Sequence, residues 1–371
     1  LHVRSRRQRQ MCIRDRIKAK RFQESMSILI QRRIGMKKII NRPEDFVKDT
    51  MEGIIAAYGD KVKLYNDDYR ILLSSYPVKE GKVGIVTAGG SGHLPVFLGY
   101  VGQGLLDGCT VGNVFASPSS AKMADTIRAC DRGNGVLVLF GNYGGDKMNF
   151  ELACETVDLE DDIKTEMVLV KDDVASAPAS EAERRRGVAG MIYAFKIAGA
   201  KAENGGTLKE VADVTRKALK NIRTMGMALT SCIVPEVGKP TFSLADDEME
   251  IGMGIHGEPG LEVRKMMTAA ELADLLLSKI LSDMPLVNGD EVSIMINGLG
   301  ATPLEEQLIV YKSVAELLQK RGVRVYMPHI GEYATSMEMA GISITLFKLD
   351  AELKGLLGQV ARSPFYTNYN K

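Results

Sequence analysis

Two histidines and one aspartate stand out because each occupies a glycine-rich segment. They are His93 in AGGSGH (88–93), Asp146 in GNYGGD (141–146) and His256 in GIHGEPG (254–260). An imidazole whose second nitrogen is held by a hydrogen bond is a nucleophile near neutral pH, and it can add to an electrophilic carbonyl. A carboxylate and a second imidazole can handle a hydroxyl proton. Such a site would select a hydroxyketone over the matching polyol, but these residues alone name neither substrate nor reaction.

The remaining motifs are less informative. A fourth glycine-rich loop, NGLGATP (297–303), has no histidine, and His329, which follows VYMP, is interpreted as a structural side chain. The two Gly-Lys pairs, at 81–82 and 238–239, are followed by Val and Pro, so a P-loop is absent. The first loop has neither the third glycine of a dinucleotide fingerprint nor the second glycine of a hydrolase elbow, because His93 stands at that position. The chain by itself shows no ATP, NAD or acyl-transfer signature.

Short β-branched runs alternate with helical stretches, which predicts an α/β fold. Strands are expected at 82–87, 135–140, 166–170, 228–234, 249–255, 291–297, 323–327 and 343–349. Helices are expected from Ser117-Pro118 to about 133 and at 147–157, 181–202, 207–226, 268–283 and 303–321. The glycine-rich loops follow strands, which is where open α/β sheets bind ligands.

We expect two closely packed α/β domains, each a sheet flanked by helices. We expect the boundary near 222–228, where the helical pair gives way to a second series of strands. This divides the chain into an N-terminal domain, 36–225, with the GGSGH and NYGGD loops, and a C-terminal domain, 226–371, with the GIHGEPG loop.

The charge balance argues against a nucleic-acid protein. The 371 residues include 48 Lys+Arg and 47 Asp+Glu, for a formal net charge of +1. This total hides an asymmetry, because residues 1–35 hold 11 basic and 2 acidic residues and the rest of the chain is acidic. No apolar run is long enough to span a membrane. The five cysteines are never spaced CxxC, which predicts buried thiols and a cytoplasmic protein without a metal site.

Three interpretations of the basic segment 1–35 remain open. It could be a basic arm for nucleic acid or anionic lipid, or an Arg-rich transit peptide. The third, which we favour, is that it is not native sequence, because RRQRQMCIRDR resembles translated sequencing-adaptor sequence. Residues 1–35 are therefore treated as a non-native or disordered leader, with Met36 as the expected start.

From Met36 onward, the sequence resembles the substrate-binding subunit of bacterial dihydroxyacetone (glycerone) kinase. The resemblance covers essentially all of 36–371, and its most specific part is GKPTFSLADDEMEIGMGIHGEPG (238–260). Further matching motifs are GGSGH (89–93), FASPS (115–119), NYGGD (142–146), RRGVAG (185–190) and NGLGATPLEE (297–306).

The resemblance implies a role for each singled-out residue. His256 matches the family histidine that holds the substrate carbonyl as a covalent hemiaminal. His93 matches the histidine that hydrogen-bonds the substrate and assists proton transfer, and Asp146 matches the aspartate that takes the proton from the hydroxyl being phosphorylated. The backbone of the first loop is expected to line the substrate, which places Gly90, Ser91 and Gly92 in the binding site, and Gly141 of the second loop is expected there as well.

The resemblance also implies partners. The family subunit is a homodimer, and it receives phosphate from a separate helical subunit that carries ADP or ATP with Mg²⁺. In many bacteria a phosphotransferase-system protein rephosphorylates that nucleotide. We therefore expect no cofactor or metal bound by this chain itself, and no nucleic-acid or membrane partner.

The chain departs from the family pattern at positions near the expected pocket. Ala88 replaces a glycine, Leu94 replaces a glutamate, and Gly141 stands where a lysine is frequent. Together with Phe97, these changes could alter the size or polarity of the pocket, so the substrate is expected to be dihydroxyacetone or a close ketose such as erythrulose. The alternative function is a non-catalytic, ketose-sensing paralogue that acts as a transcriptional co-activator. The presence of both His93 and Asp146 favours the enzyme.

Overall fold

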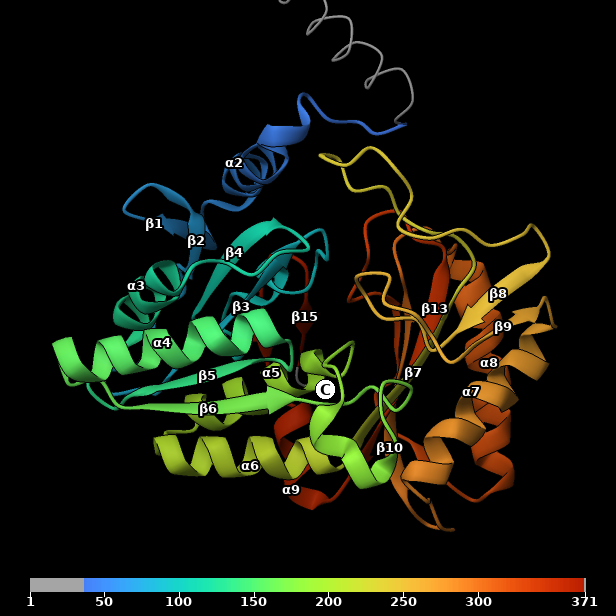
Figure 1. Ribbon diagram of the computed structural model, residues 1–371. Helices are drawn as coiled ribbons and strands as arrows, with labels where there is room; N and C mark the ends of the chain where they lie inside the picture. The colour runs from blue at the N-terminus through green and yellow to red at the C-terminus, as the bar shows by residue number, and fades with distance from the viewer. Residues whose placement is uncertain (1–36, 370–371) are drawn as a thin grey trace, which may run out of the picture.

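The computed structural model describes residues 37–369, and its strands form two large sheets (Figure 1). The first sheet has six strands in the order β1-β2-β4-β3-β5-β6. Their bounds are β1 Val62–Tyr65, β2 Asp68–Ser74, β3 Gly84–Ser91, β4 Gly108–Val114, β5 Val136–Gly141 and β6 Thr165–Val170. Strands β4, β3, β5 and β6 run parallel, so their carboxyl ends meet at one edge of the sheet. The loops that carry His93 and Asp146 follow β3 and β5, and they therefore begin side by side.

The second sheet has seven strands, in the order β11-β10-β13-β7-β8-β9 with β12 paired to β10. Their bounds are β7 Ile222–Ala228, β8 Glu248–Ile251, β9 Glu262–Lys265, β10 Glu291–Gly298, β11 Arg324–Val325, β12 His329–Glu332 and β13 Gly341–Leu349. Most pairs in this sheet are antiparallel, including β10 with β13 and β13 with β7. The segment that carries His256 connects β8 to β9.

Helices cover both faces of the first sheet (Figure 1). Helices α3, Ser120–Cys130, and α4, Gly144–Asp161, pack on one face, and α2, Phe46–Tyr58, and α6, Leu208–Lys220, belong to the core on the other. Strands β3 and β5 are buried along nearly their whole length, which explains their continuous apolar sequences. On the second sheet, α7, Ala269–Asp283, and α8, Leu304–Lys320, form a core with the outer face.

Helix α5, Met191–Glu203, joins the two sheets. It is buried on nearly every side, as expected for a helix whose apolar residues are not confined to one stripe. Its Tyr193 contacts the second sheet, since the hydroxyl lies 2.7 Å from Ser293 Oγ and the ring packs on Phe347. Its Phe195 packs on Tyr100 of the first half. The α/β architecture with two sheets flanked by helices is therefore confirmed.

The last part of the chain returns to the first half. Helix α9, Ala351–Leu357, and the short strands β14, Ala361–Arg362, and β15, Thr367–Asn368, follow β13. Leu353, Leu356 and Tyr366 from this segment belong to the same apolar core as α5 and β3. The division of the chain into 36–225 and 226–371 stays a prediction.

Some expected elements differ from the structure around residue 222. The helix expected at 207–226 ends at Lys220, and the strand expected at 228–234 is wrong, because β7 occupies 222–228 instead. Pairing with β13 on one side and β8 on the other fixes this register, and local sequence does not report such pairing. The helix expected at 181–202 begins only at Met191, and the strand expected at 249–255 ends at Ile251.

Other expectations concern composition. Cys109, Cys130, Cys154 and Cys232 are buried free thiols, as expected, whereas Cys12 and the whole segment 1–35 lie outside the described residues. Between residues 37 and 369, none of the helices has the length and apolar character that crossing a membrane requires.

Candidate active site

His93 and His256 come from different sheets and meet in the folded chain. Their ring centroids are 4.7 Å apart, with the rings nearly perpendicular. Asp146, in the first turn of α4, interacts electrostatically with His256. The structure thus brings together the three side chains that the sequence singled out. His93 and Asp146 lie where ligands bind in open α/β sheets, just beyond the carboxyl ends of β3 and β5, and His256 joins them from the segment between β8 and β9.

Glycines let the loop after β3 pass very close to the segment after β4. A Cβ atom at Gly90 would lie 2.7 Å from the backbone nitrogen of Ala116. Gly92 has φ = +102°, and a Cβ there would lie 2.9 Å from the ring of Phe115. The hydroxyl of Ser91 donates to the carbonyl oxygen of Gly112 at 2.8 Å. The GGSGH sequence is therefore required by close backbone approach, which only glycine permits at these points.

His93 is a fully buried, neutral imidazole with one nitrogen already engaged. Its Nδ1 lies 2.7 Å from the carbonyl oxygen of Thr335, and its ring stacks on Phe115. Because a carbonyl oxygen only accepts hydrogen bonds, Nδ1 carries the proton and Nε2 is an acceptor. Burial, and then the neighbouring His256, lower the pKa of His93 to about 3. Within residues 37–369 its Nε2 has no hydrogen-bond partner, so it can accept a hydrogen bond from a ligand.

The segment that holds His93 is itself fixed by the fourth glycine-rich loop. Asn297 of NGLGATP accepts hydrogen bonds from the backbone N–H groups of Tyr333 and Ala334, at 2.8 and 2.9 Å. It donates to the carbonyl oxygen of Ala334 at 2.9 Å. Asn297 therefore orders the turn that presents the Thr335 carbonyl, which gives this loop an indirect role in the site.

Asp146 is a buried carboxyl group whose acidity is weakened by its surroundings. Its exposed fraction is 6%. Burial raises the pKa of Asp146 to about 6, although a hydrogen bond with Ser117 and the interaction with His256 oppose the shift. Its Oδ1 has no hydrogen-bond partner among the described residues. A carboxyl group with a pKa near 6 is suited to general base catalysis near neutral pH.

His256 lies beside an acidic residue that the sequence analysis did not single out. Its Nδ1 is 3.0 Å from Oε1 of Glu258, and its backbone N–H donates to Oε2 of the same residue at 2.9 Å. Glu258 lies two positions further along GIHGEPG, so the spacing was visible in the sequence, but its orientation was not. The carbonyl group of Thr335 was also missed, because it belongs to the backbone and no residue type reveals it.

Aromatic side chains surround His256. The rings of Tyr143 and Phe115 lie edge-on to it, with centroids 4.9 and 5.4 Å away. Gly141, at the end of β5, packs under Tyr143, because a Cβ there would lie 3.0 Å from the Tyr143 ring and 3.3 Å from the Gly187 carbonyl oxygen. The Gly141 position therefore borders the aromatic wall around His256.

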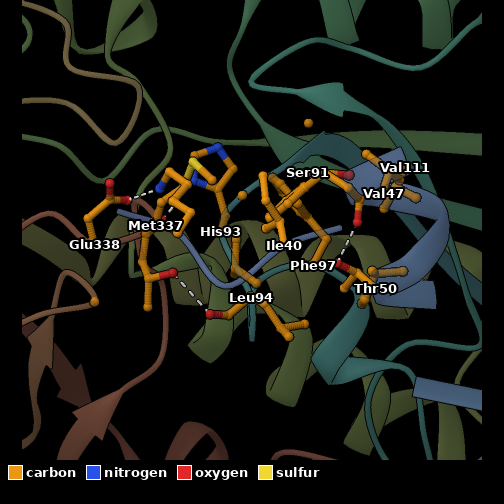
Figure 2. A pocket seen from close by; sticks show the side chains of 18 of the residues that line it. Ile40, Val47, Thr50, Ser91, His93, Leu94, Phe97, Val111, Met337 and Glu338 are labelled. Carbon is orange, nitrogen blue, oxygen red and sulfur yellow. Dashed lines mark hydrogen bonds and ion pairs between the residues drawn. The ribbon is translucent and has the colours of Figure 1, made fainter. Parts of the chain in front are cut away.

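The other departures from the family pattern lie elsewhere. Ala88 is buried in the core between the first sheet and α3 and α4. Leu94 and Phe97 line an apolar cavity of about 470 Å³, together with Ile40 and Val47, as Figure 2 shows. This cavity shares Gly90–His93 with the site, but its lining does not include Asp146 or His256. Leu94 and Phe97 therefore border the candidate site only at His93, which lines both the cavity and the site.

His329 is structural, as the sequence suggested. It is buried, with Nε2 3.1 Å from the hydroxyl of Tyr366 and its ring stacked on that residue. Burial lowers its pKa to about 4.

Asp247 of the acidic run before β8 pairs with Lys265 at 2.9 Å. Throughout the described part of the chain, no group of three or more His, Cys, Asp or Glu side chains is arranged to hold a metal ion.

Comparison with known proteins identifies the family. Residues 52–365 match the model of the Dak1 domain. The dihydroxyacetone-binding subunit DhaK of PTS-dependent dihydroxyacetone kinase 1 from Listeria innocua is 44% identical over 317 residues, covering 85% of this chain and 95% of that protein. L-erythrulose kinase from Pectobacterium atrosepticum is 41% identical over 335 residues, covering 89% of this chain but 56% of that longer protein.

A solved structure agrees with these relatives. The dihydroxyacetone kinase operon co-activator DhaQ superposes with a TM-score of 0.78 at 33% identity, covering 84% of this chain and 96% of that one. The match to the family model spans most of the chain and includes all three residues of the site. The chain therefore belongs to the Dak1 domain family.

Proposed function

We propose that this chain is the substrate-binding subunit of a dihydroxyacetone kinase, which phosphorylates dihydroxyacetone or a close ketose such as erythrulose. The observation that carries the proposal is the meeting of His93, Asp146 and His256, two of which present a buried acceptor atom with no hydrogen-bond partner among the described residues. A small polyhydroxylated ketone offers the hydroxyl groups that such acceptors require. The similarity to a dihydroxyacetone-binding subunit supports the same substrate class.

In the proposed reaction, His256 captures the ketone. Its Nε2 bonds to the carbonyl carbon, the carbonyl π electrons move to oxygen, and that oxygen takes a proton from a solvent acid (hydronium or protonated buffer). The product is a hemiaminal whose imidazole ring carries the positive charge. The polyol glycerol has no electrophilic carbon and cannot be held in this way. Covalent capture fixes the remaining hydroxymethyl group in one position, which lowers the entropy cost of the transfer step.

Asp146 and His93 then act on the hydroxyl groups. The Asp146 carboxylate accepts the proton of the terminal hydroxyl as its oxygen bonds to the incoming phosphoryl group. His93, held neutral by burial, accepts a hydrogen bond at Nε2 and aligns the ketose. The backbone of Gly90, Ser91 and Gly92 lines the substrate next to His93. Catalysis of phosphoryl transfer is expected to rest mainly on positioning and electrostatics.

The phosphoryl group comes from a partner in this proposal. A separate helical subunit carries ADP or ATP with Mg²⁺ and supplies the phosphate, and a phosphotransferase-system protein renews it. The chain acts as a homodimer in the cytoplasm. Similarity to the subunit of a PTS-dependent dihydroxyacetone kinase from Listeria innocua supports this choice of donor.

Gly141 bears on the choice between ketoses. Because it has no side chain beside Tyr143, whose ring contacts His256, we propose that the site accepts a four-carbon ketose as well as dihydroxyacetone. Similarity to an L-erythrulose kinase supports this extension.

The similarity to an operon co-activator favours a second candidate function, which is ketose sensing without phosphoryl transfer. A sensor needs His256 to bind the ketose but has no use for a general base such as Asp146. The presence of an unpartnered carboxylate oxygen at Asp146, among the residues described, favours the kinase.

The deciding experiment supplies the purified chain with its cognate nucleotide-bearing subunit and phosphoryl donor, and measures phosphorylation of dihydroxyacetone and L-erythrulose. We expect product from at least one ketose, none from glycerol, and none with His256→Ala. Absence of product from both ketoses, with ketose binding retained, would contradict the kinase function and support the sensor.

A further inference from the structure

Glu258 makes two hydrogen bonds to one residue. Its Oε1 faces Nδ1 of His256 at 3.0 Å, and its Oε2 accepts from the backbone N–H of His256 at 2.9 Å. A carboxylate can accept at both oxygens at once, whereas an amide can accept at only one. The geometry therefore matches an ionised glutamate and fixes both the imidazole ring and the backbone that carries it.

Glu258 stays ionised in this setting. Burial alone would raise the pKa of Glu258, but the hydrogen bonds from the side chain and backbone of His256 outweigh burial and lower it to about 2. An ionised carboxylate cannot donate, so the proton between the two groups belongs to Nδ1 of His256. The lone pair of the imidazole is then on Nε2, the atom available to a ligand.

Arg186 holds Glu258 from the other half of the chain without taking its hydrogen bonds. The guanidinium is bound mainly to Asp173, with Nε and Nη2 2.9 and 2.7 Å from Oδ2, and it donates to the Gly252 carbonyl oxygen at 3.1 Å. Its Nη1 lies 3.8 Å from Oε2 of Glu258, which is beyond a hydrogen bond but close for an ion pair. Both Glu258 oxygens therefore stay available to His256.

We propose that Glu258 is a positioning residue, which holds His256 in the Nδ1–H tautomer and leaves Nε2 free to bond to the ketone, with Arg186 anchoring Glu258. The catalytic part of this inference rests on the proposed function. When Nε2 bonds to the carbonyl carbon, the ring becomes an imidazolium and the oxygen takes a proton from a solvent acid, so the adduct gains one positive charge overall. Glu258 then faces a full positive charge 3.0 Å away and stabilises the adduct. This is the arrangement in which a carboxylate orients a catalytic histidine.

The test reads the tautomer directly, before any activity is measured. The ligand-free protein is labelled with ¹⁵N-histidine, and the imidazole nitrogen shifts of His256, assigned by comparison with His256→Ala, report which nitrogen carries the proton. We expect a pure Nδ1–H tautomer in the wild type and a shift toward Nε2–H in Glu258→Ala. Glu258→Gln, which can accept only one of the two N–H groups, is expected to lie between them.

Glu262→Gln is the matched control, because Glu262 lies on the adjacent β9 and pairs with the exposed Arg264. Its spectrum should equal that of the wild type, and the His93 and His329 signals should stay unchanged in all variants. An Nε2–H tautomer in the wild type, or an unchanged tautomer in a folded Glu258→Ala, would overturn the proposal.

Activity in the reconstituted complex separates this inference from the proposed function. We expect Glu258→Ala to lower kcat/KM for the ketose about a hundredfold, since misplacing a reacting group costs about that much. A tautomer change in Glu258→Ala, together with no ketose phosphorylation by the wild type, would refute the kinase function while supporting the positioning role. Full activity in a folded Glu258→Ala would overturn the positioning role.

Discussion

The Nδ1 atom of His93 lies 2.7 Å from the carbonyl oxygen of Thr335, a residue 242 positions later in the chain. This contact joins the loop after β3 of the first sheet to the segment that connects β12 and β13 of the second. The contact fixes the proton of His93 on Nδ1. It therefore leaves Nε2 as a free acceptor in the site. The site therefore exists only when the two halves of the chain are packed together.

Asp146→Asn should make the protein more stable and less active. Above pH 6 the wild type keeps a buried, ionised carboxylate, and raising its pKa from 3.8 to about 6 costs up to about 3 kcal/mol of stability. At pH 8 we therefore expect a gain of about 1 to 3 kcal/mol in the free energy of unfolding, measured by urea denaturation. The rate of ketose phosphorylation should fall about 10²- to 10⁴-fold.

The stability gain of Asp146→Asn should shrink as the pH falls from 6 to 4. In that range the carboxyl group of the folded wild type becomes protonated, so the wild type no longer bears the free-energy cost of a buried charge. Asp246→Asn, at an exposed position, is the control, and we expect it to change stability by less than about 0.5 kcal/mol. A less stable Asp146→Asn at pH 8 would show that the buried carboxylate is compensated and contradict this account.

The pH dependence of kcat/KM should include an acid limb near pH 6. Below this pH, Asp146 becomes protonated and can no longer accept the hydroxyl proton, so activity should fall about tenfold per pH unit. His93 should not contribute a limb above pH 4, because burial and His256 lower its pKa to about 3. Steady-state rates measured from pH 5 to 8 with a saturating partner subunit test this. A profile flat to pH 5 would exclude Asp146 as the base.

His329 should make the fold sensitive to acid. Its pKa is lowered from 6.5 to about 4 by burial, so the unfolded chain binds its proton first as the pH falls. The stability it contributes is present above pH 6.5 and is lost toward pH 4, by up to about 3 kcal/mol. In His329→Gln we expect lower stability at pH 7 but a shallower loss between pH 6.5 and 4. Equal slopes in urea denaturation would show that His329 does not carry this dependence.

Gly254→Ala should disturb the site without unfolding the protein. A Cβ at Gly254 would overlap Oε2 of Glu258 and Nη1 of Arg186, so Glu258 must move away from His256. We expect kcat/KM for the ketose to fall about tenfold or more, with the circular dichroism spectrum unchanged.

Gly53→Ala is the matched control, because a Cβ there meets no described atom within 4 Å. It lies within α2 and should stabilise the protein by about 0.5–1 kcal/mol without loss of activity. Equal activity of the two variants would contradict the role given to Glu258.

The sequence by itself determined the fold class and singled out the candidate site residues. Glycine-rich segments after β-branched runs mark places where backbone passes close to other backbone, and a histidine or aspartate there lies at the end of a strand. Strands β3, β5, β10 and β13 were predictable because they are buried on both faces and their apolar runs are continuous. His93, Asp146 and His256 were therefore identified without any coordinates.

Only the tertiary structure decided how these residues are used. The register of β7 depends on pairing with β13, and the tautomer of His93 depends on a carbonyl group of Thr335, which no residue type reveals. The Arg186 contact with Glu258 also crosses between the halves of the chain. Local sequence reports local propensity, whereas these relationships arise from packing between segments far apart in the chain. For that reason the residues of the site were predictable and their electrostatic coupling was not.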